Sequence, residues 1–333
     1  MMRKQGAAGG HMDSSVFSEL KGMLLSRSSL PDAGKLPSAQ MRKELSLFLK
    51  RYGSSSNDSA ATSAGDIASF IKGHRLLESM DSYLREFGER GITLVIVEGG
   101  DATGKTSLTK RLGKDLKGAY IVNQSGFLFH DLFGLPKEYK AAIVDYSRNP
   151  NVAFLYYFVQ NIYALETLLR LSKNKKFALL DSCVLRTLSS HRAHPSFSRG
   201  GGEKIVGTGR LKSLIDRQLN KGALATIRKN AKSIFFVFLY SSERARAAQA
   251  RERTGINAFD VNRKYYSYMT AYLKKEQLAL RKSGVRMLSM LTVEEKSASV
   301  VAQWADSIFI RSNSRGADLR EKSAVIEKTI HNL

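Results

Sequence analysis

The chain has 333 residues, 43% of them hydrophobic, which is enough for one large domain with an extension or for two domains. No apolar run approaches the roughly 20 residues that cross a bilayer, so we expect neither an integral membrane protein nor a membrane partner. Cys183 is the single cysteine, which excludes an internal disulfide and is typical of a reducing compartment.

The net charge is unusually positive. The chain has 53 Lys and Arg residues against 30 Asp and Glu residues, giving +23, more than solubility requires. A field of this sign attracts polyanions whatever the fold is. Three interpretations stay open: a contact with RNA or a ribonucleoprotein such as a mitochondrial ribosome, residence in mitochondria, or a generally basic proteome.

The first 90 residues read as an extension. Residues 1–37 are rich in Gly, Ser and Ala, and their basic start fits an organelle-targeting signal or a disordered tail equally well. The apolar spacing over 37–52 predicts a short amphipathic helix. A second helix is predicted from Asp66, as its cap, towards Phe87. We therefore expect residues 1–90 to form a basic, partly disordered extension with two short helices.

A glycine-rich motif follows the first predicted strand. The apolar run 92–97 leads into G-x-x-x-x-G-K-T over residues 99–106, and an amphipathic helix is predicted over 107–116. Glycines let backbone N–H groups point at phosphate oxygens, Lys105 adds a positive charge, and the Thr106 hydroxyl can hold Mg²⁺. Chance glycines in a turn are the alternative, but they explain neither the strand before nor the helix after. The predicted nucleotide-binding residues are Gly99, Gly100, Thr103, Gly104, Lys105, Thr106 and Ser107.

Strands and helices alternate through the rest of the chain. This pattern predicts an α/β fold, a P-loop three-layer α/β/α arrangement with a mostly parallel sheet, over residues 91–311 and before a polar tail at 312–333. Strands are predicted at 120–123, 177–181, 234–240 and 285–291, and helices at 152–171, 211–230, 242–253, 261–282 and 293–308.

Two further features bear on phosphate chemistry. Asp181 ends an apolar strand. Beside a phosphate-binding loop, an aspartate in this position is typically a ligand of Mg²⁺ or of its water shell; the alternative is that it caps the next helix.

Four arginines follow the strand at 234–240, namely Arg244, Arg246, Arg251 and Arg253. Such arginines can close as a lid on a transferring phosphoryl group, or they can form a solvated helix face.

Residues 98–107, Glu-Gly-Gly-Asp-Ala-Thr-Gly-Lys-Thr-Ser, resemble the E-G-x-D-x-x-G-K-T-[TS] signature of the thymidylate kinase family. The Asp-Ala-Thr variant is similar to its mitochondrial UMP-CMP kinase branch, and the similarity continues at Asp181 and 241–251. The resemblance implies a nucleoside monophosphate kinase that uses ATP and Mg²⁺. The expected acceptor is a pyrimidine nucleotide, with dTMP as the first candidate. It also implies a homodimer and, with the basic charge, a mitochondrial rather than a cytoplasmic location.

The same resemblance assigns roles to particular residues. Asp101 would contact the sugar of the acceptor, and Arg251 or Arg253 would reach the transferring phosphoryl group from the lid. Tyr157 or Phe158 would stack on the acceptor base, with Asn161 nearby for hydrogen bonding. Aromatic residues at this helical spacing are alternatively plain core, and the sequence leaves both interpretations open.

The acceptor half also departs from the family pattern. Ser182 and Cys183 stand where the family has Arg and an aromatic residue, so Arg186, displaced along the same turn, would have to bridge the phosphates. The arginine expected to grip the acceptor phosphate is not evident over 124–131. A catalytically weakened ATP-binding protein that binds RNA through its basic surface is therefore the alternative function.

Overall fold

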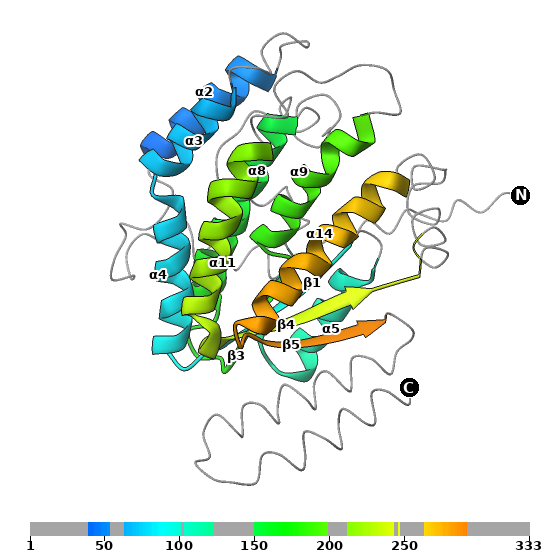
Figure 1. Ribbon diagram of the computed structural model, residues 1–333. Helices are drawn as coiled ribbons and strands as arrows, with labels where there is room; N and C mark the ends of the chain where they lie inside the picture. The colour runs from blue at the N-terminus through cyan, green and yellow to red at the C-terminus, as the bar shows by residue number, and fades with distance from the viewer. Residues whose placement is uncertain are drawn as a thin grey trace, which may run out of the picture.

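The computed structural model describes residues 39–53, 63–100, 103–122, 150–198, 212–242, 246 and 263–291. Its strands form one sheet and its helices pack against that sheet (Figure 1). The strands are β1 Thr93–Gly99, β2 Ala119–Val122, β3 Phe177–Asp181, β4 Ile234–Tyr240 and β5 Arg286–Leu291. The α-helices are α2 Ala39–Gly53, α3 Ser63–Gly73, α4 Leu76–Glu89, α5 Lys105–Asp115, α8 Pro150–Leu171, α9 Val184–Ser198, α11 Asn220–Lys229 and α14 Arg263–Lys282. A π-helical turn, η2 Ile215–Leu219, and a 3₁₀ turn, η3 Ala231–Ser233, flank α11.

The sheet has the strand order β2-β3-β1-β4-β5, and every pair of neighbouring strands is parallel. Parallel sheets need both faces covered, and their strands are therefore apolar throughout, as the buried runs of β3 and β4 are. The predicted α/β class with a parallel sheet is thus confirmed. The predicted strands agree with the observed ones within about two residues, the usual uncertainty of such boundaries.

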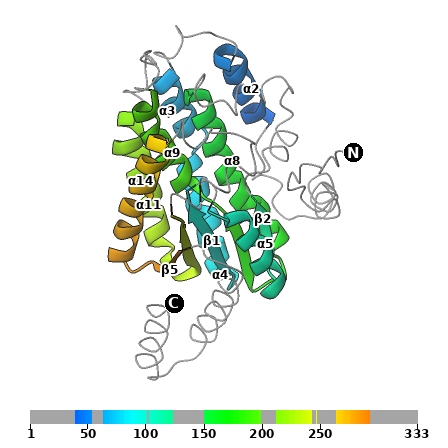
Figure 2. The same cartoon turned by 90° about the vertical axis from the view of Figure 1, so that its right-hand side faces the viewer.

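Each face of the sheet contributes to its own hydrophobic cluster. Along β1, Leu94 and Ile96 join the larger cluster with the α4, α8, α9, α11 and α14 side chains, while Val95 and Val97 join the smaller cluster with α5. This alternation follows from the two-residue period of a strand. Figure 2 shows α5 and α14 on opposite sides of the sheet, which makes the fold a three-layer sandwich.

The helices before the sheet differ from the prediction in number. One helix was expected from Asp66 towards Phe87, but the chain breaks at Arg75, whose φ of 50° is left-handed, and continues as α4 at an angle to α3 (Figure 1). Asp66 lies inside the first turn of α3 and is not the cap of one long helix. The break allows α4 to lie along α8 and to bury Phe87 in the core.

The larger cluster also includes side chains of the first helices. Leu45 and Ile67 are fully buried and belong to the same hydrophobic cluster as Ile96 of β1. Within the described residues, α2 to α4 therefore pack on the same hydrophobic core as the sheet. The tail at 312–333 and the predicted helix at 293–308 lie outside the described residues, as does most of the predicted helix at 242–253. None of the described helices has the length and apolar character needed to cross a membrane.

Helix α9 was not predicted. Ser189, Ser190 and Arg192 give it a polar sequence, yet all three side chains are buried because α9 packs against both α8 and α14. Arg192 forms ion pairs with Glu276 of α14, at 2.5 Å, and with Asp216 of η2, at 2.6 Å. Buried charges need such partners. Because apolar spacing is the signal that predicts a helix from sequence, a helix that is stabilised by buried ion pairs is not predicted from it.

Candidate phosphate-binding site

The glycine-rich loop connects the carboxyl end of β1 to the start of α5, as the sequence predicts. A Cβ atom on Gly99 would lie 2.5 Å from the Leu239 carbonyl oxygen of β4, so no larger residue fits. Gly104 has a φ of 81° and precedes the first residue of α5, a left-handed conformation that glycine adopts without strain. These two glycines set the path of the loop around the amino end of the helix.

The loop is folded over its own lysine. The Lys105 ammonium donates a hydrogen bond of 2.6 Å to the Gly100 carbonyl oxygen, which also accepts from the Thr103 hydroxyl at 2.9 Å. Lys105 is only 3% exposed. The first N–H groups of α5 have no partner within the helix, and the helix dipole is positive at this end. Loop, lysine and helix end together form a site that suits an anion.

A long-range hydrogen bond of the site joins Thr106 to Asp181. The Thr106 hydroxyl in the first turn of α5 donates to Asp181 Oδ2 at the end of β3, at 2.5 Å. Asp181 is fully buried, and its other oxygen, Oδ1, has no hydrogen-bond partner among the described residues. An unpaired carboxylate oxygen beside a hydroxyl suits Mg²⁺, which takes oxygen ligands from one or two side chains and from bound phosphates. Asp181 thus lies beside Thr106, and its role as a magnesium ligand stays a prediction.

Glu98, to which the sequence pattern assigned no role, is a second buried carboxyl at this edge. It is fully buried at the end of β1, where it accepts a hydrogen bond from the Cys183 N–H at 3.4 Å. Burial raises the pKa of Glu98 to about 7, although the positive charges of Lys105 and Arg186 oppose the rise. The sequence feature that could have indicated this site is a glutamate at the end of an otherwise apolar strand.

Arg186 and Ser182 occupy the turn between β3 and α9. The Ser182 N–H donates to the Val97 carbonyl oxygen at 2.9 Å, and the residue has a φ of 69°. Arg186 lies in the first turn of α9 and is partly exposed, and its charge lowers the pKa of Glu98. The structure thus brings Arg186 to the phosphate side of the sheet, while its contact with an acceptor stays a prediction.

Arg246 is the described member of the predicted arginine cluster. A Cβ atom on Gly100 would lie 3.1 Å from Arg246 Nη1, so the guanidinium lies against the phosphate loop. Nη1 donates to the Thr270 hydroxyl of α14 at 3.0 Å, and the guanidinium lies 5.9 Å from the centre of the Tyr266 ring. Arg246 is 7% exposed. Asp101, Arg251 and Arg253 lie outside the described residues.

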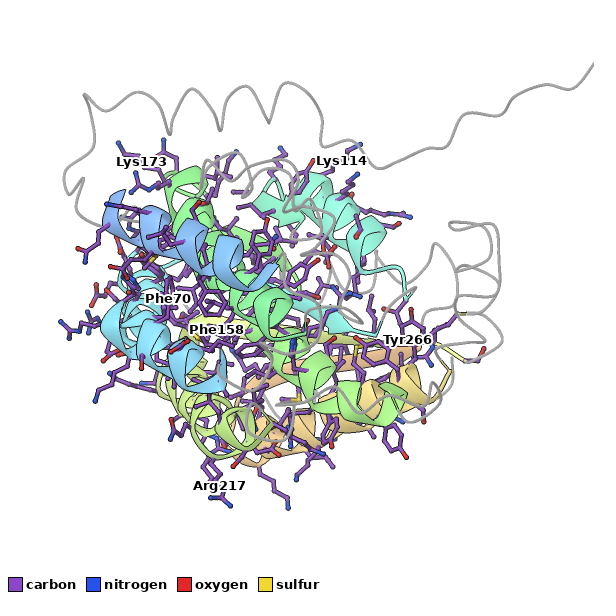
Figure 3. The ribbon with its side chains drawn as sticks, turned by 90° about the horizontal axis from the view of Figure 1, so that it is seen from above. Phe70, Lys114, Phe158, Lys173, Arg217 and Tyr266 are labelled. Carbon is purple, nitrogen blue, oxygen red and sulfur yellow. The ribbon has the colours of Figure 1, made fainter. Side chains whose placement is uncertain are left out.

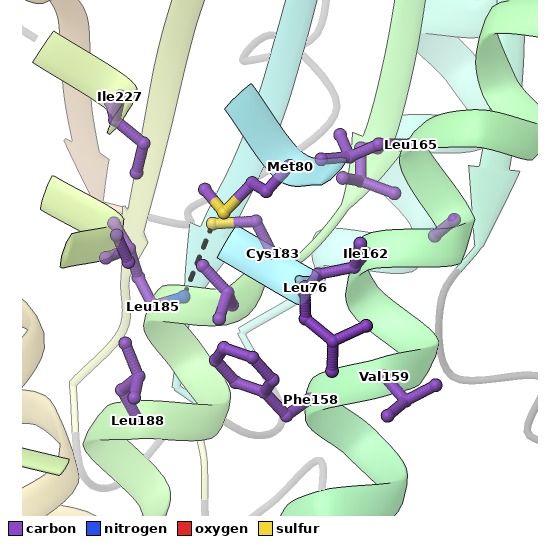
Figure 4. Packing of buried hydrophobic residues seen from close by; sticks show 14 of the residues in the cluster. Leu76, Met80, Phe158, Val159, Ile162, Leu165, Cys183, Leu185, Leu188 and Ile227 are labelled. Carbon is purple, nitrogen blue, oxygen red and sulfur yellow. Dashed lines mark hydrogen bonds between the residues drawn. The ribbon is translucent and has the colours of Figure 1, made fainter. Parts of the chain in front are cut away.

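Of the two residues proposed to stack on the acceptor base, Phe158 lies in the core, whereas Tyr157 is only partly buried and packs against the core, so its stacking role stays a prediction. Phe158 is fully buried, and Figure 4 shows its ring among buried aliphatic side chains that include Leu76 and Leu188. The Asn161 amide donates to the Tyr157 carbonyl oxygen and to the Thr187 hydroxyl, both at 2.7 Å, and so ties α8 to α9. The prediction that Phe158 stacks on an acceptor base is therefore wrong, because neither face of its ring is accessible. Asn161 is likewise placed as a core contact.

No protein-family model matches the chain, and no curated protein is significantly similar to it in sequence. The chain has a P-loop α/β fold, because a strand of a parallel sheet, the G-x-x-x-x-G-K-T loop and a helix follow one another and Asp181 lies beside them. Among solved structures, a gluconokinase from Sinorhizobium meliloti 1021 is similar, at 16% identity over 66% of this chain and 92% of that chain. The TM-score between the two structures is 0.27, and none of the comparisons supports the thymidylate kinase family specifically.

Proposed function

We propose that the protein is a phosphotransferase that transfers the γ-phosphoryl group of ATP to a pyrimidine nucleoside monophosphate, with dTMP as the first candidate. The observation that carries this proposal is the 2.5 Å contact between Thr106 and Asp181 at the mouth of the phosphate loop. A glycine-rich loop alone supports nucleotide binding. A carboxylate that reaches the loop threonine from a neighbouring strand adds the metal ligands that phosphoryl transfer requires.

The loop residues would act on the donor nucleotide. Backbone N–H groups of the loop and of the first turn of α5 would bind phosphate oxygens. The Lys105 ammonium would give up its hydrogen bond to the Gly100 carbonyl oxygen and bind the phosphates instead. Thr106 and Asp181 would hold Mg²⁺, which neutralises phosphate charge when it is bound. The side chains are already gathered around the loop, so little reorganisation is needed.

Arg246 would supply positive charge beside the transferred group. Phosphoryl transfer depends on positioning and on charge stabilisation, and a guanidinium against Gly100 lies within the site. Thr270 and Tyr266 hold this guanidinium on α14, so it does not need a lid to arrive. Arg251 and Arg253 remain the predicted lid arginines of the proposal.

The acceptor assignment depends on the family resemblance. Asp101 would contact the acceptor sugar, and Arg186 would take the part of the arginine that Ser182 replaces. Arg186 supports this assignment because it is partly exposed and faces the same edge of the sheet as Lys105 and Glu98. Phe158 has no part in the acceptor site as proposed here.

The proposal is tested first by calorimetry with ATP and Mg²⁺, and then by a coupled assay with dTMP, dUMP, UMP and CMP. We expect ATP binding and diphosphate formation with at least one acceptor. Lys105→Ala should lower turnover by about 10²-fold or more, because it removes the charge aimed at the phosphates. The exposed Lys114→Ala on the same helix serves as the control and should leave turnover unchanged.

The two measurements separate the alternatives. ATP binding without turnover on any pyrimidine monophosphate would overturn the phosphotransferase and leave an ATP-binding protein. Absence of ATP binding by the folded chain would overturn the nucleotide site itself. Equal losses in Lys105→Ala and Lys114→Ala would show that the effect is not specific to the loop.

A further inference from the structure

Six basic side chains gather at the amino edge of the sheet, opposite to the phosphate loop. All five strands are parallel, so the residues before each strand lie at one edge of the sheet. The register places Ala119 beside Ala178, Phe177 beside Thr93, and Ile234 beside Leu94. Each of the strands β2 to β5 is preceded by at least one of these six side chains: β2 by Lys114 and Lys117, β3 by Lys173 and Lys175, β4 by Lys232, and β5 by Lys282. We call these six lysines the amino-edge row.

The lysines of the amino-edge row lie on the surface of the described part of the chain. All six are exposed, and none forms an ion pair with a carboxylate of the described residues. The described acidic groups near this edge already have basic partners: Asp115 pairs with Arg111, Glu86 with Arg90, Glu89 with Arg85, and Asp81 with Lys229. Figure 3 shows the Lys114 and Lys173 side chains pointing outwards on the same side of the molecule. The edge therefore presents a positive field to solvent.

We propose that the amino-edge row binds the sugar–phosphate backbone of a nucleic acid without reading its bases. Neighbouring strands lie about 4.8 Å apart, so five strands spread the row over about 19 Å. A duplex carries one negative charge per about 1.7 Å of its axis, and several phosphates can therefore face the row together. The surface is independent of the proposed phosphotransferase site, which lies at the opposite edge.

The chemistry of the row favours a nucleic acid over a membrane. Lysines are mobile point charges on long stems, which suits a phosphate backbone better than the fixed geometry of base edges. The exposed residues at 114–117 and 173–176 are Lys, Asp and Asn. A membrane surface would take large apolar side chains into its headgroup layer, and base stacking would need aromatic ones. Neither kind is exposed in these two segments.

The test measures binding of the full chain to a fluorescent RNA duplex by anisotropy over a series of salt concentrations. A DNA duplex and a single-stranded RNA are run in parallel, and they show which nucleic acid is preferred. We expect affinity to fall steeply with salt and to vary little with base sequence. The variant Lys114→Gln, Lys117→Gln, Lys173→Gln and Lys175→Gln should bind at least about tenfold more weakly, with a log–log salt slope smaller by about 3 to 4.

A charge-matched control separates the row from the overall charge. Lys72→Gln, Lys221→Gln, Lys274→Gln and Lys275→Gln also remove four exposed lysines, away from this edge. The control variant should keep the affinity and salt slope of the unchanged protein. Equal losses in both variants would overturn the proposal in favour of net charge alone. Binding to phosphatidylserine vesicles in preference to every nucleic acid would also overturn it. ATP binding measured on both variants checks that they are folded.

Discussion

The two edges of the sheet use charge in opposite ways. At the carboxyl edge, Lys105, Asp181 and Glu98 are nearly or fully buried, and each has a defined neighbour. At the amino edge, the six lysines of the amino-edge row are exposed and have no carboxylate partner among the described residues. Buried charges are held in one geometry and can serve chemistry, whereas exposed ones act through a field that salt screens. Substitutions should therefore have specific effects at the first edge and additive effects at the second.

The largest effect is expected at Asp181. Asp181→Asn keeps an oxygen that can accept from the Thr106 hydroxyl but removes the charge that would hold Mg²⁺. Turnover should fall by about 10²- to 10³-fold, because the charge of the phosphates is no longer balanced. The coupled assay over a Mg²⁺ titration measures this loss. Asp115→Asn, an exposed residue on α5 that pairs with Arg111, is the control and should behave as the unchanged protein. Full activity of Asp181→Asn would remove the magnesium site from the proposal.

Glu98 makes the stability of the apo-protein depend on pH. Its pKa is raised from 4.5 to about 7 in the folded state, so folded protein holds a proton that unfolded protein has lost between these values. The free energy of unfolding should therefore fall as pH rises from about 4.5 to 7, by about 3 kcal/mol at most. Chemical denaturation at several pH values measures this slope.

The comparison with Glu98→Gln isolates that carboxyl. The glutamine variant cannot ionise and should lose most of the slope, while the exposed Glu89→Gln should keep it. The same slope in all three proteins would show that Glu98 does not carry the pH dependence.

A smaller effect is expected at Arg246. Arg246→Lys keeps a positive charge but cannot keep the planar contacts with Thr270 and Tyr266, so turnover should fall by about tenfold. Arg217→Lys, at an exposed position of η2, is the matched control. Calorimetry and the coupled assay together show whether ATP affinity or turnover is lost. If Arg246→Lys changes the melting temperature but neither of these, the residue is a structural link between the loop and α14.

Much of the fold could be read from the sequence. The runs that became β1, β3 and β4 are apolar along their length, and buried parallel strands have this pattern. Helix α9 was not predicted because its buried side chains include polar ones, so it lacks the apolar spacing of a typical buried helix. One of them, Arg192, forms its ion pairs with residues of α14 and η2. The break between α3 and α4 at Arg75 was not predicted either, because the apolar positions of the helical pattern continue across it.

The site could be read only in part. Lys105 and Thr106 follow the glycine-rich loop directly, as the sequence predicts, but they lie in the first turn of α5 rather than before it. Their contact with a nucleotide stays a prediction. Phe158 was placed wrongly, because helical spacing alone does not say whether a ring faces a ligand or other helices. Glu98 received no role, because its raised pKa comes from burial, which depends on the whole fold.

By itself, the sequence determined the strand, the phosphate loop and the helix that follows, since short-range hydrogen bonds and glycine conformations specify them. Tertiary structure alone decided that Asp181 would meet Thr106 across 75 residues and that Arg246 would lie against Gly100. It also decided that lysines between positions 114 and 282 would share one edge. The reason is that parallel strands align all their starts on one side and all their ends on the other, whatever their distance along the chain.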